Sequence, residues 1–136
     1  MKVTGLNHIT LAVADVERSL AFYRDVPGLN VRAVWPEGAC LEVGALWLCL
    51  SQDSAARTSP YPDYTHFAFS VPGADFHDFS KRLTDACVVW KSDGNEGAST
   101  YFPDPDGHKL EIHVGSLETR LAHYRQRPSR GMTMFD

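Results

Sequence analysis

The sequence lacks the features of a membrane, secreted or nucleic-acid-binding protein. No apolar run approaches the roughly 20 residues that a transmembrane helix needs, and Met1–Gly5 has no signal-peptide hydrophobic segment. The formal net charge is -4 without a basic stripe, which disfavours a nucleic-acid partner. The only cysteines are Cys40, Cys49 and Cys87, without metal-finger spacing, which favours free thiols in a reducing compartment. We therefore expect a cytoplasmic protein, with Cys49 and Cys87 in its apolar core.

Two segments of the chain follow one pattern, in which a short alternating run is followed by an Asp and then by helical spacing. They are Asn7–Val13 with Asp15 and Thr65–Val71 with Asp75. Alternation predicts strands. Each Asp is a suitable helix N-cap, because its carboxylate can accept hydrogen bonds from the first-turn N–H groups. The apolar stripes of the two helices are expected at Val16, Leu20 and Tyr23, and at Phe76, Phe79 and Leu83.

The repeated pattern predicts an α+β fold of two tandem βαβββ units within a single domain spanning residues 1–136. We place the first unit at about 4–52, a linker at about 53–62, the second unit at about 63–115 and a C-terminal helix, capped by Ser116, at about 116–126. Because one face of each sheet packs on a helix, the two free faces can curve into a shared cup. The remaining strands are expected at Val31–Trp35, Ala39–Val43, Leu46–Ser51, Val88–Lys91, Ser99–Phe102 and Lys109–Val114.

Three of the expected strands carry metal-ligating side chains on the face opposite their apolar residues. Side-chain alternation puts His8 on the face of Thr10, and Glu111 on the face of His113, with His66 on the polar face of its own strand. Two imidazoles and a carboxylate suit Mn, Fe, Co, Ni or Zn and leave positions open for a substrate. His8 and His66 occupy equivalent places in the two halves, which favours ligands over chance surface histidines. We predict a metal held by His8, His66 and Glu111, with His113 as the alternative ligand.

A spaced set of short segments carries a family resemblance. It comprises Gly5–Val13, Leu46–Ser51, Asp63–His66, Trp90–Lys91, Glu96–Ser99, Asp104–Glu111 and Val114–Leu121. These segments resemble the fosfomycin-resistance glutathione transferases of the vicinal-oxygen-chelate superfamily, which also holds glyoxalases, bleomycin-resistance proteins and dioxygenases. The resemblance implies a homodimer with a Mn²⁺ centre, to which one subunit gives His8 and the other gives His66 and Glu111.

The resemblance also implies the reaction, which adds the thiol of glutathione to the epoxide of fosfomycin. A metal can stabilise the alkoxide that forms as the epoxide opens, and Lys91 and Arg120 can neutralise the phosphonate. Thr10, Lys91 and Arg120 are the expected catalytic residues. The full set expected to bind substrate is Thr10, Trp47, Lys91, Asn95, Ser99, Tyr101 and Arg120. The resemblance implies a K⁺ ion in the loop at 92–99, held by Asp93, Glu96, Gly97 and Ser99.

Four positions depart from the family's pattern. Cys40 stands where the family usually has a Tyr that is thought to help the glutathione thiol, and a cysteine cannot replace a phenol as a donor. In the loop, Gly94 stands in place of an Arg, and Asn95 in place of a Ser that contacts the phosphonate. Asp93 stands in place of an Asn and adds a negative charge at the expected K⁺ site. The expected metal ligands are unchanged, so the departures bear on the use of glutathione.

Three other functions remain open at this level. Water could open the epoxide instead of a thiol, with Glu37 as the nearest candidate base. Two His and one carboxylate also describe Fe(II) dioxygenases of this fold, although the phosphonate-type set with Lys91 and Arg120 disfavours an uncharged catechol. A drug-binding protein without catalysis would share the architecture but would not need the metal ligands.

We expect the Cys40→Tyr variant to raise the glutathione-dependent rate, on the order of tenfold, because it restores a phenol donor beside the thiol. The rate is measured by steady-state kinetics with fosfomycin and glutathione, and thermal unfolding checks that the variant is folded. Cys40→Phe is the matched control, since it has the ring without the hydroxyl. An unchanged rate in a folded Cys40→Tyr variant would contradict the assigned role.

Overall fold

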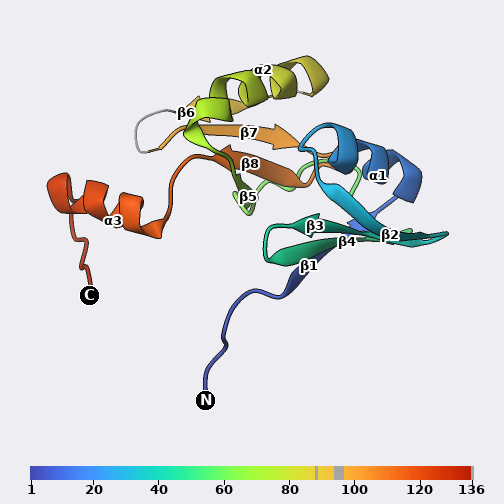
Figure 1. The fold of residues 1–136 in the computed structure, drawn as a ribbon, viewed down its shortest axis with the longest axis horizontal. Coiled ribbons are helices and arrows are strands. Elements are labelled where there is room, and N and C mark those ends of the chain that lie inside the picture. The colour runs from blue at the N-terminus through green and yellow to red at the C-terminus, as the bar shows by residue number, and fades with distance from the viewer. Residues whose placement is uncertain (88, 94–96, 136) are drawn as a thin grey trace. The chain divides into compact units, whose positions relative to one another are not determined.

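The computed structural model describes residues 1–87, 89–93 and 97–135 and consists of two similar halves followed by a helix (Figure 1). The predicted α+β class and βαβββ order are confirmed. The first half contains β1 (His8–Val13), α1 (Val16–Asp25), β2 (Asn30–Trp35), β3 (Gly38–Val43) and β4 (Leu46–Gln52). The second contains β5 (Phe67–Ser70), the 3₁₀ turn η1 (Gly73–Asp75), α2 (Phe76–Ala86), β6 (Lys91–Asp93), β7 (Ser99–Pro103) and β8 (Lys109–His113), and α3 (Leu117–Gln126) follows.

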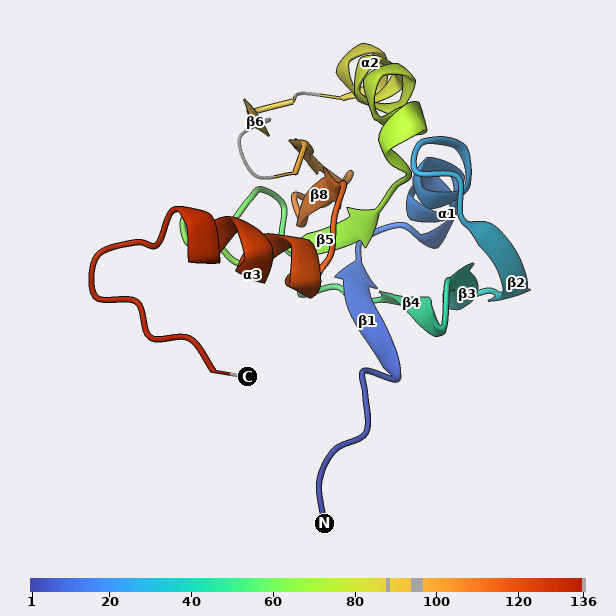
Figure 2. The same ribbon diagram turned by 60° about the vertical axis from the view of Figure 1, so that its left-hand side comes forward.

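The two four-stranded sheets have equivalent strand orders, β1-β4-β3-β2 and β5-β8-β7-β6. In each sheet the first strand of the half pairs in parallel with the last, β1 with β4 and β5 with β8. The hairpin-connected pairs β2–β3, β3–β4 and β6–β7 are antiparallel. The strands of the first sheet can be followed in Figure 2. The repeat in the sequence is therefore also a repeat of sheet topology.

The first sheet has one apolar face, over which α1 lies (Figure 1). Leu11 and Val13 of β1 are buried together with Leu41, Leu48 and Leu50 of the neighbouring strands. Burial of each such side chain stabilises the fold by about 1.5–3 kcal/mol relative to exposure. The opposite face is left for polar side chains, because successive residues of a strand point to opposite sides.

Two details of the helices differ from the prediction. The buried residues of α1 are Val16, Ser19 and Tyr23, whereas Leu20 is only half-buried. Ser19 is tolerated in the interior because its hydroxyl donates to a buried carboxylate. Asp15 caps α1 through Arg18 N–H as predicted, but Asp75 makes no side-chain capping hydrogen bond. Asp75 belongs to a 3₁₀ turn and has helical backbone angles, whereas an N-cap residue needs an extended backbone.

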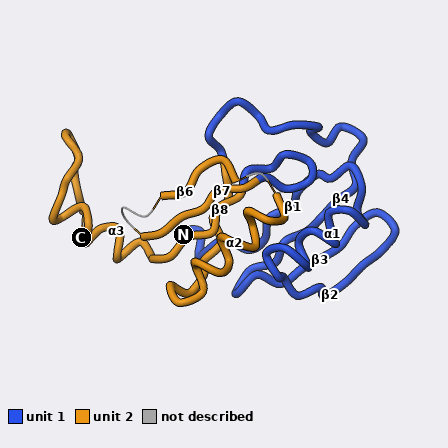
Figure 3. The backbone as a smooth tube through the Cα atoms, turned by 90° about the horizontal axis from the view of Figure 1, so that it is seen from above, with its two compact units in different colours: residues 1–65, 103–109 blue, residues 66–102, 110–136 orange. Residues whose placement is uncertain are grey.

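The chain divides into two compact units (Figure 3). One consists of residues 1–65 and 103–109, and the other of residues 66–102 and 110–136. The returning segment 103–109 passes close to the chain at Ser59 and Pro60, where Gly107 has φ +93° and a Cβ would collide with their backbone. Only glycine fits that position without strain. Among the described residues, no helix has the length and apolar character needed to cross a membrane.

Candidate metal centre

One face of the second sheet gathers polar side chains around Glu111. The opposite face is apolar, with Phe102, Leu110 and Ile112 fully buried. Strand register and hydrogen bonding place Lys91 and Asp93 of β6, Ser99 and Tyr101 of β7, and Glu111 and His113 of β8 on the polar face. The period-2 reading of β8 is thus confirmed.

The side chain of Glu111 is only 5% exposed, and both oxygens of its carboxylate have neighbouring polar groups. Its Oε1 lies 3.0 Å from Nε2 of His66. Its Oε2 accepts a hydrogen bond of 2.8 Å from the Ser99 hydroxyl and lies 3.1 Å from Nδ1 of His113. Ser99 Oγ is also 2.7 Å from Nδ1 of His113. One carboxylate oxygen is therefore fixed by Ser99 and His113, and the other faces His66.

The spacing of His66 and Glu111 fits a divalent metal ion. Two ligand atoms about 2.1 Å from one ion in adjacent octahedral positions are about 3.0 Å apart, which matches the His66–Glu111 distance. Ser99 and His113 then act as the outer partners that orient a ligating carboxylate. His113 thus supports Glu111 in this arrangement, while the sequence had left it as an alternative ligand.

The ring of Tyr101 has both His66 and the amino group of Lys91 as neighbours. Its ring packs edge-on against His66 with centroids 5.4 Å apart, and Lys91 Nζ lies 5.1 Å from the ring centroid. Tyr101 is 8% and Ser99 5% exposed. Lys91 therefore places a positive charge over the ring of Tyr101. The hydroxyl proton of Ser99 is directed to Glu111, so Ser99 offers an incoming anion no donor in this arrangement.

The expected K⁺ loop is only partly described. Asn95 and Glu96, and Gly94 beside them, lie outside the described residues. Gly97 has φ +70°, and a Cβ there would collide with the Val114 carbonyl, so this position requires glycine. Asp93 pairs with Ser99 in the register of β6 and β7.

The remaining predicted residues lie on the first sheet and on α3. His8 and Thr10 are exposed on β1. The His8 ring stacks on Trp47 of β4, with centroids 4.8 Å apart and planes at 12°. His8 Nδ1 donates a hydrogen bond of 2.6 Å to Asn7 Oδ1, which leaves Nε2 as the free ligand atom. Arg120 lies exposed on α3, not on a strand face.

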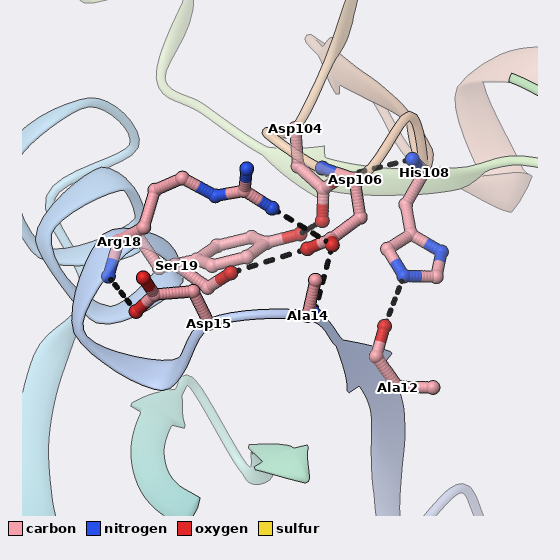
Figure 4. A network of polar contacts seen from close by, with 9 residues as sticks. Ala12, Ala14, Asp15, Arg18, Ser19, Asp104, Asp106 and His108 are labelled. Atoms are coloured by element: carbon pink, nitrogen blue, oxygen red, sulfur yellow. Dashed lines mark hydrogen bonds and ion pairs between the residues drawn. The ribbon is translucent and has the colours of Figure 1, made fainter. Parts of the chain in front are cut away.

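A second cluster, which the sequence analysis gave no role, consists of Asp104, Asp106 and His108 (Figure 4). Their ligand atoms lie within 4.8 Å of one another, and all three residues are buried. The only sequence signal was the segment Asp104–Glu111 of the family resemblance. The cluster has the composition of a metal site. Whether protein donors already occupy its carboxylates decides its role.

Protein donors already fill this second cluster. Asp106 accepts from Ala14 N–H at 2.9 Å, from the Arg18 guanidinium at 2.9 Å and from the Ser19 hydroxyl at 3.2 Å. Asp104 accepts from the Tyr23 hydroxyl at 2.7 Å and from the N–H groups of Asp106 and His108. His108 Nε2 donates to the Ala12 carbonyl at 2.9 Å. The cluster therefore ties the 103–109 segment to β1 and α1 and needs no ion.

Burial shifts the pKa values of Tyr23 and Asp104, which lie at the centre of this network. Desolvation, together with the negative charge and hydrogen bond of Asp104, raises the pKa of Tyr23 well above its usual value. Burial also raises the pKa of Asp104, although hydrogen bonds from Tyr23 and from two backbone N–H groups oppose the shift. Tyr23 therefore keeps its proton and acts as a hydrogen-bond donor.

Comparison with known proteins agrees with this fold. Residues 5–112 match the Glyoxalase/Bleomycin resistance protein/Dioxygenase superfamily. The chain is 52% identical over 131 residues to glutathione transferase FosA of Serratia marcescens, covering 94% of this chain and 93% of that protein. It is 36% identical over 129 residues to metallothiol transferase FosB of Staphylococcus haemolyticus, covering 91% and 93%.

A solved structure is also similar to most of this chain. It is the fosfomycin resistance protein FosX of Listeria monocytogenes complexed with Mn(II) and sulfate, with a TM-score of 0.79 and 27% identity over 90% of this chain and 99% of that chain. The chain belongs to the Glyoxalase/Bleomycin resistance protein/Dioxygenase superfamily. Within it, the resemblance to the fosfomycin-resistance glutathione transferases is confirmed.

We expect Asp106→Ala to lower the free energy of unfolding by about 2–4 kcal/mol, because it leaves the buried Ser19 hydroxyl and Ala14 N–H without an acceptor. The change is measured by urea unfolding followed by circular dichroism. Asp25→Ala is the control, since it removes an exposed carboxylate paired with Arg24 and should leave stability unchanged. Equal stability of the two variants would contradict the structural role of the cluster.

Proposed function

We propose that this protein inactivates fosfomycin by adding the thiol of glutathione to the epoxide carbon, in a metal-dependent reaction. The observation that carries the proposal is the buried Glu111 carboxylate 3.0 Å from His66, with Lys91 and Tyr101 beside the pair. The 52% identity to a glutathione transferase over nearly the full chain supports the choice of thiol.

The metal would be held by His66 and Glu111, with His8 supplied by a second copy of the chain. The exposure of His8 and its free Nε2 support this assignment, and a homodimer is therefore part of the proposal. The Listeria relative that contains Mn(II) supports manganese, which prefers nitrogen and oxygen ligands such as these. We also propose that K⁺ binds at Asp93, Glu96, Gly97 and Ser99, and that the protein works in the cytoplasm.

The residues of this chain would bind and orient the phosphonate epoxide. Lys91 and Arg120 neutralise the phosphonate, and Thr10 and the Tyr101 hydroxyl donate to it, with Trp47 and Asn95 completing the binding set. When bound, the divalent ion supplies positive charge where negative charge develops as the epoxide opens. The sulfur forms a bond to carbon, the carbon–oxygen bond breaks, and the thiol proton ends on the epoxide oxygen.

Hydration of the epoxide is the second candidate. A mutant of Listeria FosX, 25% identical with a TM-score of 0.76, is complexed with Mn(II) and 1S,2S-dihydroxypropylphosphonic acid, which is the diol that addition of water to this epoxide gives. The candidate base Glu37 is exposed in the turn between β2 and β3. The relative with 52% identity is a glutathione transferase, so we rank hydration below thiol addition.

Phosphorus NMR of fosfomycin with the protein, Mn²⁺ and K⁺ distinguishes the two reactions. We expect a new signal only when glutathione is present, because the thiol is the nucleophile. A new signal without thiol would establish hydration instead. No new signal in either sample, from protein shown to bind Mn²⁺, would exclude fosfomycin as the substrate while leaving the metal centre in place.

We expect Glu111→Gln to weaken Mn²⁺ binding by more than about 100-fold, because a neutral amide is a poor substitute for a ligating carboxylate. His113→Ala should weaken it by about 10–100-fold, since it removes only a partner that orients Glu111. Both are measured by titration of Mn²⁺ followed by electron paramagnetic resonance. Glu42→Gln, a surface carboxylate paired with Arg32, is the control. An affinity in Glu111→Gln equal to that of the control would disprove the ligand assignment.

A further inference from the structure

Two cysteines face each other on neighbouring strands of the first sheet. Cys40 of β3 and Cys49 of β4 are directly opposite in the antiparallel register, and their sulfur atoms are 3.1 Å apart. Both side chains are free thiols and only half-buried. The prediction that Cys49 lies in the core is wrong, because the buried residues of β4 are its neighbours Leu48 and Leu50.

The geometry of this pair is close to that of a disulfide. Residues directly opposite in an antiparallel ladder have Cα atoms about 4.5–5.5 Å apart, within the range of about 4.4–6.8 Å that a disulfide spans. The sulfurs need to approach by about 1 Å to reach the bond length of about 2.05 Å. Side-chain rotation can supply that movement while the strands stay paired.

The pair also lies on the functional face of the sheet. The parallel register sets Thr10 of β1 opposite Cys49, and His8 opposite Trp47. Cys40, Cys49 and Thr10 therefore form one row across three strands on the face opposite the apolar core. Any change at the sulfur pair alters the surface beside Thr10.

We propose that Cys40 and Cys49 are a thiol modification site, which forms a reversible disulfide across β3 and β4 with glutathione disulfide as the oxidant. One of the two cysteines, as a thiolate, attacks one sulfur of glutathione disulfide and forms a mixed disulfide, releasing one glutathione. The other cysteine then attacks the protein sulfur of the mixed disulfide and releases the second glutathione. Both protein thiols are oxidised, both glutathione sulfurs are reduced, and the two thiol protons end on the two glutathione molecules.

The contacts of the three cysteines distinguish the pair from Cys87. The contact with Cys49, together with burial, raises the pKa of Cys40 to about 11. Cys87 is separate, because its thiol donates to the Leu83 carbonyl at 3.2 Å at the end of α2 and burial raises its pKa.

The expected consequence rests on the proposed function. Glutathione is then both the co-substrate and the reductant of the pair, so a high proportion of glutathione disulfide oxidises the row beside Thr10. We expect the oxidised protein to show a several-fold lower glutathione-dependent rate, restored by dithiothreitol. Full activity of a protein shown to carry the disulfide would overturn this consequence.

The site itself is tested without any activity measurement. The full-length protein is incubated with glutathione disulfide and analysed by intact mass and by peptide mapping without reduction. We expect a loss equal to the mass of two hydrogen atoms and a peptide that links Cys40 to Cys49, both reversed by dithiothreitol. The Cys87→Ser control should behave like the unmodified sequence.

The single variants separate the two steps. Cys40→Ser should stop at a mixed disulfide of glutathione with Cys49, and circular dichroism checks that it is folded. A lasting mixed disulfide in the unmodified sequence, a link that involves Cys87, or no reaction under conditions that oxidise a model dithiol peptide would each overturn the proposal. Because these readouts are masses, they stand whether or not the protein turns over fosfomycin.

Discussion

The buried carboxylate of Glu111 is the constraint on which the candidate metal centre depends. An ionised carboxylate removed from water is costly unless it is paired and hydrogen-bonded, and here Ser99, His113 and His66 meet that requirement. The same contacts fix its direction, so one oxygen is held and the other faces the histidine. A divalent cation held by His66 and Glu111 would add positive charge beside this carboxylate.

A second buried carboxylate system holds the framework of the other unit. Asp104 and Asp106 accept hydrogen bonds from residues of β1, α1 and the loop between them, including Ala14, Ser19 and Tyr23. The two acidic clusters resemble each other in composition but differ in what surrounds them. Protein donors saturate Asp104 and Asp106, whereas the Glu111 oxygen that faces His66 remains suited to a cation.

One face of the first sheet carries both the proposed metal ligand His8 and the thiol pair of Cys40 and Cys49. His8 is held by Asn7 and stacked on Trp47, which fixes the ring of the proposed ligand. On the same face, Cys40 stands where the family resemblance implies a tyrosine, and it lies against Cys49. The departure from the family pattern therefore both removes a phenol and creates a thiol pair.

The sequence alone determined the βαβββ repeat and the polar face of β8, because side-chain alternation fixes which residues share one side of a strand. Family resemblance added the reaction and the substrate-binding residues. Alternation could not reveal that Ser99 and His113 hold Glu111, that Ser19 is buried against Asp106, or that Cys40 meets Cys49. Those contacts join residues distant in sequence or on different strands, and only the strand register and the packing of the tertiary structure bring their atoms together.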